Sequence, residues 1–223
     1  SAIVGCSAIN TSVGKKELDV QTKMSQTIFL DPVSPDKRVI YIDVKNTSDK
    51  PNLIIEPQIK AGIAASGYKV TDNPDEATYL LQANILQIGR KNTREGKPDG
   101  TATVIGAGAG SLMGDGDGQA AMAIVGALIG TMVDASVKDV YYTLITDIRL
   151  SERTKPGAVI NEVAKSTLTQ GTSGRVEQSS HGTSEWRRYQ TKIVSVANQA
   201  NLEYQDAEPE LVKGLVQSLS NLF

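Results

Sequence analysis

The chain has 223 residues, of which 22% are charged, with a formal net charge of −2, one cysteine and one histidine. This length suffices for a sizeable core in one domain or two, while the near-neutral charge gives no electrostatic footprint for nucleic acid. Cys6 and His181 alone cannot build a disulfide framework or a zinc site, and no Ser-His-Asp triad is supported by the spacing of residues around His181. We therefore expect no enzyme, no metal site and no cofactor, and the charge balance adds the expectation of no nucleic-acid partner.

The first six residues, SAIVGC, match the lipobox at which bacterial lipoproteins are processed. The peptidase needs small side chains before the cut, and the cysteine thiol carries a diacylglycerol. We therefore predict lipidation of Cys6, with a buried structural cysteine as the alternative. The polar residues that follow suit a tether, and we assign residues 1–20 to the lipobox and the tether.

A β-α-β pattern follows the tether. It indicates strands at residues 27–30 and 38–44, a helix at 53–66, a short strand from 68 to 70 and a central strand at 79–88. The helix carries Ile55, Ile59 and Ile63 about one turn apart. Gly67 follows as a typical C-cap residue. This order predicts a small α+β unit.

Residues 101–133 contain no Lys, Arg, Glu or His and carry glycines at intervals of four. The spaced glycines are Gly106, Gly110 and Gly114 in a first apolar arm, and Gly126 and Gly130 in a second. Such spacing places small residues on one helix face, where two backbones can approach closely. Asp115 and Asp117 lie in the turn between the arms. We predict an inserted helical hairpin at residues 96–137, called the glycine hairpin below.

The arms of the glycine hairpin, residues 101–113 and 119–133, are short for a membrane span. At 1.5 Å per residue they reach about 20 and 23 Å, against a hydrocarbon core of ~30 Å. The bacterial outer membrane is thinner than average, and mismatch costs little. Each interior glycine costs roughly 1 kcal/mol relative to alanine, so the arms need close packing partners. We favour a membrane-inserted homo-oligomer, with a hairpin buried in a soluble core as the alternative.

Strand-like sequence resumes after the glycine hairpin. Residues 138–150 are rich in β-branched and aromatic side chains and are predicted to pair with the strand at 79–88. We expect a turn at 151–156, a Ser/Gly-rich loop at 171–183 that contains a solvated His181, and a strand at 186–196. Residues 206–223 are predicted to form an amphipathic helix with Pro209 in its first turn. Its apolar stripe comprises Leu211, Leu215, Leu219 and Leu222.

These elements predict an α+β fold. A small mixed sheet with flanking helices is built from residues 21–95 and 138–223. The Gly-rich apolar helical hairpin is inserted between two strands of this sheet, and the whole assembles as an oligomer.

Distinctive short segments run in order along nearly the whole chain, at residues 20–28, 31–32, 45–50, 82–84, 142–147, 152–155, 170–174 and 189–192. In these segments, the lipobox and the glycine hairpin, the chain resembles the TraT family of plasmid-encoded outer-membrane lipoproteins. Members of that family act in surface exclusion, are associated with resistance to complement and assemble as oligomers. Cys6 matches the lipidated position, and Ser7 after it agrees with sorting to the outer membrane.

The resemblance implies a non-enzymatic lipoprotein, exposed at the surface of the outer membrane. Its expected role is to block entry of a like plasmid from a donor cell, with complement resistance as a further role. Expected partners are membrane lipid, other copies of the chain, and mating-pair components or the pilus of the donor. The alternative is an oligomeric lipoprotein channel or secretion conduit. We disfavour it because a pore needs a hydrated lumen and the two arms carry few polar side chains.

Overall fold

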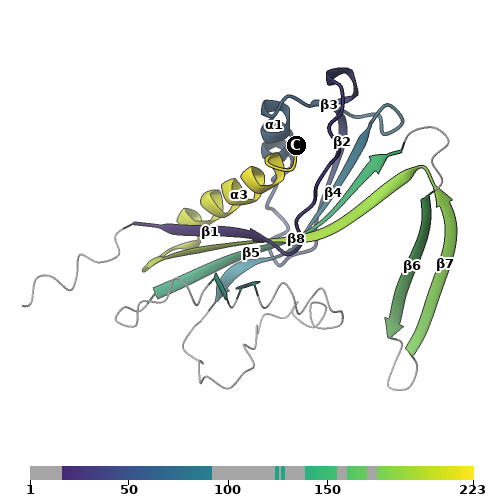
Figure 1. Cartoon of the computed structure of the whole chain (residues 1–223). Coiled ribbons are helices and arrows are strands. Elements are labelled where there is room, and N and C mark those ends of the chain that lie inside the picture. The colour runs from purple at the N-terminus through teal and green to yellow at the C-terminus, as the bar shows by residue number, and fades with distance from the viewer. Residues whose placement is uncertain (1–16, 92–123, 126, 129–138, 155–159, 170–174) are drawn as a thin grey trace, which may run out of the picture.

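The computed structural model describes residues 17–91, 124–125, 127–128, 139–154, 160–169 and 175–223. The described part is mixed α+β, as predicted, with one six-stranded sheet and one two-stranded sheet (Figure 1). The elements are β1 (Asp19–Met24), the 3-10 turn η1 (Pro35–Lys37), β2 (Val39–Asn46), α1 (Glu56–Ala65), β3 (Lys69–Thr71), β4 (Tyr79–Lys91), β5 (Asp139–Arg153), β6 (Ile160–Thr169), β7 (Arg175–Ser184), β8 (Trp186–Ala200) and α3 (Tyr204–Ser220). The larger sheet has the order β1-β8-β5-β4-β2-β3.

The predicted β-α-β unit is confirmed. Strand β2 pairs in parallel with both β3 and β4, and α1 connects β2 to β3. Ile55, Ile59 and Ile63 are all buried, which confirms the apolar stripe. Gly67 follows the helix with a φ of 91°, a conformation that glycine adopts without steric cost.

The pairing predicted across the glycine hairpin is also confirmed. Strand β5 lies antiparallel to β4, with Lys91 opposite Tyr141 at one end and Tyr79 opposite Glu152 at the other. On its other side β5 pairs antiparallel with β8 along its whole length. Residues 92–138 therefore connect the ends of two neighbouring, paired strands.

The strand predicted at residues 27–30 is wrong, because the edge strand of this region is β1. Strand β1 pairs antiparallel with β8 and ends at Met24. The chain then leaves the ladder because a side chain takes over its hydrogen bonds. The Thr191 hydroxyl accepts from the Gln26 amide at 3.1 Å and donates to the Gln26 carbonyl at 2.9 Å.

Two further predictions are corrected in the second half of the sheet. The expected turn at 151–156 begins too early, since β5 runs to Arg153. The loop predicted at 171–183 is wrong for most of its length, because β7 includes His181 and pairs with the unpredicted strand β6. Strand propensity depends strongly on cross-strand and packing context, so the pairing of β6 with β7 decides the outcome here.

Both long helices cover one face of the six-stranded sheet (Figure 1). α3 packs on β8 and β1, and α1 packs beside it on β2 and β3. Leu211, Leu215 and Leu219 are buried as predicted, while Leu222 is partly buried. The helix begins at Tyr204, so Pro209 lies inside it and not in its first turn.

Two glycines allow the helices to pack this closely. A Cβ atom added at Gly62 of α1 would lie 2.5 Å from Val216 Cγ1 of α3. One added at Gly214 of α3 would overlap the Thr22 hydroxyl of β1, which is itself hydrogen-bonded to Ser195 Oγ at 2.8 Å. At these two glycines, side chains of the neighbouring element therefore lie directly against the helix backbone.

Candidate functional site

The residues predicted to anchor and assemble the chain lie outside the described residues. They are Cys6, Gly106, Gly110, Gly114, Asp115, Asp117, Gly126 and Gly130. Among the residues that the structure does describe, no helix has both the length and the apolar character needed to cross a membrane.

A short part of the second arm of the glycine hairpin is described, and it contacts the sheet. Val125 and Leu128 are 1% and 0% exposed. Their cluster is completed by Tyr141, Ile145, Val194 and Val196, with the partly buried Leu86 and Ile124 beside it. Successive strand residues face opposite sides of a sheet, and this cluster is separate from the core under α1 and α3. At this point the arm is covered by its own chain, as the buried-hairpin alternative expects for these residues.

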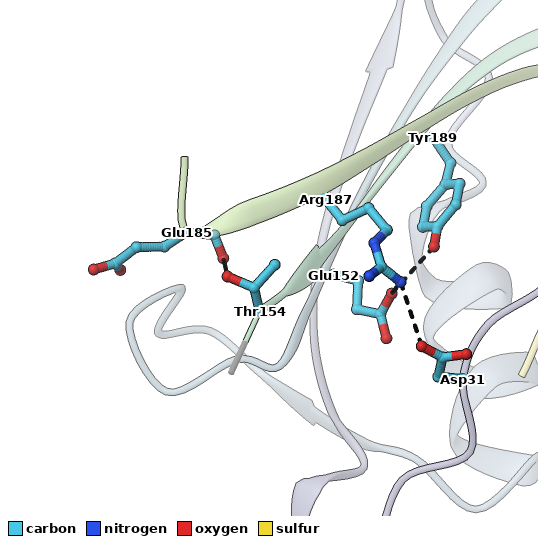
Figure 2. Close-up of polar contacts among 6 residues, drawn as sticks. All are labelled: Asp31, Glu152, Thr154, Glu185, Arg187 and Tyr189. Atoms are coloured by element: carbon cyan, nitrogen blue, oxygen red, sulfur yellow. Dashed lines mark hydrogen bonds and ion pairs between the residues drawn. The ribbon is translucent and has the colours of Figure 1, made fainter. Parts of the chain in front are cut away.

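A polar cluster lies at the end of the six-stranded sheet where β5 ends and β8 begins (Figure 2). We call Asp31, Glu152, Arg187 and Tyr189 the junction cluster. Arg187 Nη1 lies 3.3 Å from Asp31 Oδ2 and 3.5 Å from Glu152 Oε2. The Tyr189 hydroxyl donates to Glu152 Oε2 at 3.2 Å.

Burial divides the two carboxylates of the junction cluster. The Glu152 side chain is only 9% exposed, whereas the Asp31 side chain is 77% exposed. A buried carboxylate requires partners that offset its lost hydration. Glu152 finds them in Arg187 and Tyr189. The interaction with Tyr189, the hydrogen bond with Asp31 and the charge of Glu152 raise the pKa of Arg187, so the cation is fixed.

A second set of contacts fastens the same ends of β5 and β8. Thr154 donates to the Glu185 carbonyl twice, from its amide at 2.8 Å and from its hydroxyl at 2.9 Å (Figure 2). The Arg153 guanidinium lies 4.5 Å from the centre of the Trp186 ring and donates from Nε to the Ala77 carbonyl at 3.0 Å. These contacts hold the two strands together immediately before β6 and after β7.

The junction cluster is suited to holding structure in place. Both carboxylates pair with the same arginine, and no group of residues within the described ranges has the composition of a metal site. Sequence reasoning missed this cluster because Glu152 was assigned to a turn and Asp31 to a strand break. Three members, Asp31, Glu152 and Tyr189, nevertheless fall within the segments on which the family resemblance rests.

An apolar groove of about 520 Å³ lies between the start of α1 and the middle of α3. Its lining includes Leu53, Ile54, Val212 and Val216. Ile54 is 72% exposed. This groove is the second surface feature that the sequence did not indicate.

Comparison with known proteins gives one consistent result. The family model described as "Enterobacterial TraT complement resistance protein" matches residues 17–223. A TraT complement resistance protein of Escherichia coli K12 is 38% identical over 230 residues, covering 99% of this chain and 93% of that protein. A TraT complement resistance protein of Wigglesworthia glossinidia brevipalpis is 47% identical over 88 residues, covering 40% of this chain and 36% of that protein.

Proposed function

The chain belongs to the family of TraT complement resistance proteins, and on that premise we propose that it protects the cell that carries it from complement. The observation that carries this proposal is similarity over almost the whole length of both proteins. It includes the sheet, both helices and the glycine hairpin, so no separate activity domain is needed to account for the chain.

In the proposed mechanism the protein acts through its binding surface at the outside of the cell and catalyses no reaction. We propose that Cys6 carries the diacylglycerol anchor, that the protein lies in the bacterial outer membrane with its folded part surface-exposed, and that several copies form a homo-oligomer. One acyl chain binds a membrane only marginally, whereas several chains or a second membrane element anchor a protein stably. The glycine hairpin of each copy supplies the second membrane contact, and close packing of its small residues supports the assembly.

Serum survival tests the proposed protection. Expressed in a complement-sensitive enteric strain, the full chain with a lipoprotein signal peptide is expected to raise survival in active serum and to change nothing in heat-inactivated serum. The matched control is Cys6→Ala, which is expected to lose both outer-membrane fractionation and protection. Unchanged survival with the wild-type protein present at the surface would contradict the proposal.

Surface exclusion is the finer function that the family resemblance implies, and we propose it for the same surface assembly. A recipient that expresses the chain is expected to accept a matched conjugative plasmid less often, while transfer from an unmatched donor stays the same. Equal transfer from every donor would exclude this function and leave complement resistance standing. A conductance for small ions in planar bilayers would instead favour the conduit alternative.

A further inference from the structure

Strands β6 and β7 form a two-stranded ribbon that stands apart from the six-stranded sheet (Figure 1). Their antiparallel ladder runs without a break from Ile160 opposite Ser184 to Thr169 opposite Arg175. Among the described residues, the main contact of the ribbon is the one between β6 and β7 themselves. A two-stranded ribbon alone is marginally stable at best in water. The ribbon therefore needs a further partner to be stable.

Both long edges of the ribbon are open within the described part of the chain. In an antiparallel pair, every second residue directs its N–H and C=O groups away from the partner strand. Proteins usually protect such an edge with proline, with unbalanced charge or with a covering element. Neither INEVAKSTLT in β6 nor RVEQSSHGTS in β7 contains proline, and each strand carries one acid and one Lys or Arg. These edges lack the usual sequence features that prevent pairing.

The base of the ribbon is fixed in direction, which favours a binding role. The two hydrogen bonds from Thr154 to Glu185 and the stacking of Arg153 on Trp186 hold the strand ends together. The junction cluster continues this fastening into the sheet. A segment that is held in place before binding loses less conformational entropy when it binds.

We propose that the ribbons of neighbouring copies pair edge to edge, with β6 of one copy beside β7 of the next. This inference rests on the proposed homo-oligomer and names its interface. The two strands have the same length, and antiparallel pairing between copies continues the alternation inside each ribbon. A foreign strand would cover one edge and leave the other open, whereas a closed ring of copies removes every open edge.

Hydrogen–deuterium exchange on the purified full-length protein tests the pairing. In a free ribbon about half of the amides of residues 160–169 and 175–184 are unpaired and exchange rapidly. In the proposed ring nearly all of them are protected. The extra protection is expected to disappear together with the oligomer on dilution, as followed by native mass spectrometry.

Adjacent proline variants provide the second measurement. Successive amides of β6 point to opposite edges. Of the two variants Ser166→Pro and Thr167→Pro, one therefore removes an N–H group on the outer edge of the ribbon, and the other removes an N–H group that faces β7. The outer-edge variant is expected to keep the fold by circular dichroism and lose the oligomer, whereas Gly89→Ala in β4 keeps both. An oligomer whose ribbon amides are only half protected would overturn the interface and leave the homo-oligomer standing. A monomer at every concentration would overturn both.

Discussion

Glu152 shows how one residue position depends on several distant ones. Its carboxylate is nearly buried and is held by Arg187 and Tyr189 from the neighbouring strand β8. Asp31 joins the same arginine from a segment that lies 156 positions away in sequence. A buried carboxylate is stable only while these partners are present.

Two tyrosines that lie close to Glu152 should differ in how stability responds to loss of the hydroxyl group. Tyr189→Phe removes the donor to Glu152 and is expected to lower the free energy of unfolding by about 1–2 kcal/mol. Tyr79→Phe removes a buried hydroxyl that has no hydrogen-bond partner in the described structure. It should leave stability unchanged or raise it. Urea unfolding of both variants at pH 7 decides this, and equal losses would contradict the assignment.

Tyr79 also predicts a loss of stability at alkaline pH. Burial raises the pKa of its phenol well above the ordinary value of 10. The unfolded chain therefore releases this proton first, so the contribution of Tyr79 is complete below about pH 10 and is lost as the pH rises further. Tyr79→Phe should flatten the fall in unfolding free energy between about pH 9 and 11. Parallel curves for the variant and the wild type would refute this.

At the scale of elements, the helices and the central strands have different origins from the ribbon. α1 and α3 carry their apolar residues on one stripe, so each helix has a face that must be buried. β6 and β7 have no such pattern and are strands only through each other. Helix packing then adds the close approach at Gly62 and Gly214, which periodicity alone does not reveal.

Gly214 tests this close approach between α3 and β1. Gly214→Leu must displace the Thr22 hydroxyl and its hydrogen bond to Ser195. It is expected to lower the unfolding free energy by about 1–3 kcal/mol through overpacking, despite the better helix propensity of leucine. Gly89→Ala is the control, since nothing lies within 4 Å of the added Cβ atom. A Gly214→Leu protein as stable as the wild type would show that α3 sits further from the sheet.

At the scale of the whole molecule, the six-stranded sheet separates two apolar clusters. One lies under α1 and α3, and the other contains Val125 and Leu128 from the second arm of the glycine hairpin. The arm is therefore tied to the folded domain near the point where the chain re-enters the sheet at β5. Any membrane contact of the glycine hairpin has to be compatible with this attachment.

Leu128 measures that attachment. Leu128→Ala is expected to lower the unfolding free energy of the folded domain by about 2–5 kcal/mol, because it leaves a cavity against Tyr141 and Ile145. The neighbouring Ala127 is exposed, so Ala127→Ser should change stability by less than about 0.5 kcal/mol. Urea unfolding compares the two. Equal, small effects would mean that this arm does not rest on the sheet.

The sequence by itself determined the family, the α+β class, α1, α3, and the pairing of β4 with β5 around the glycine hairpin. These conclusions rest on local periodicity and on short family-like segments that follow one another in the same order along the chain. Only the tertiary structure decided β1, the β6–β7 ribbon, the junction cluster and the place of Leu128. The physical reason is that each of these depends on partners far away in sequence. Thr191 ends the β1 ladder, β7 makes a strand of β6, and Arg187 joins Asp31 to Glu152.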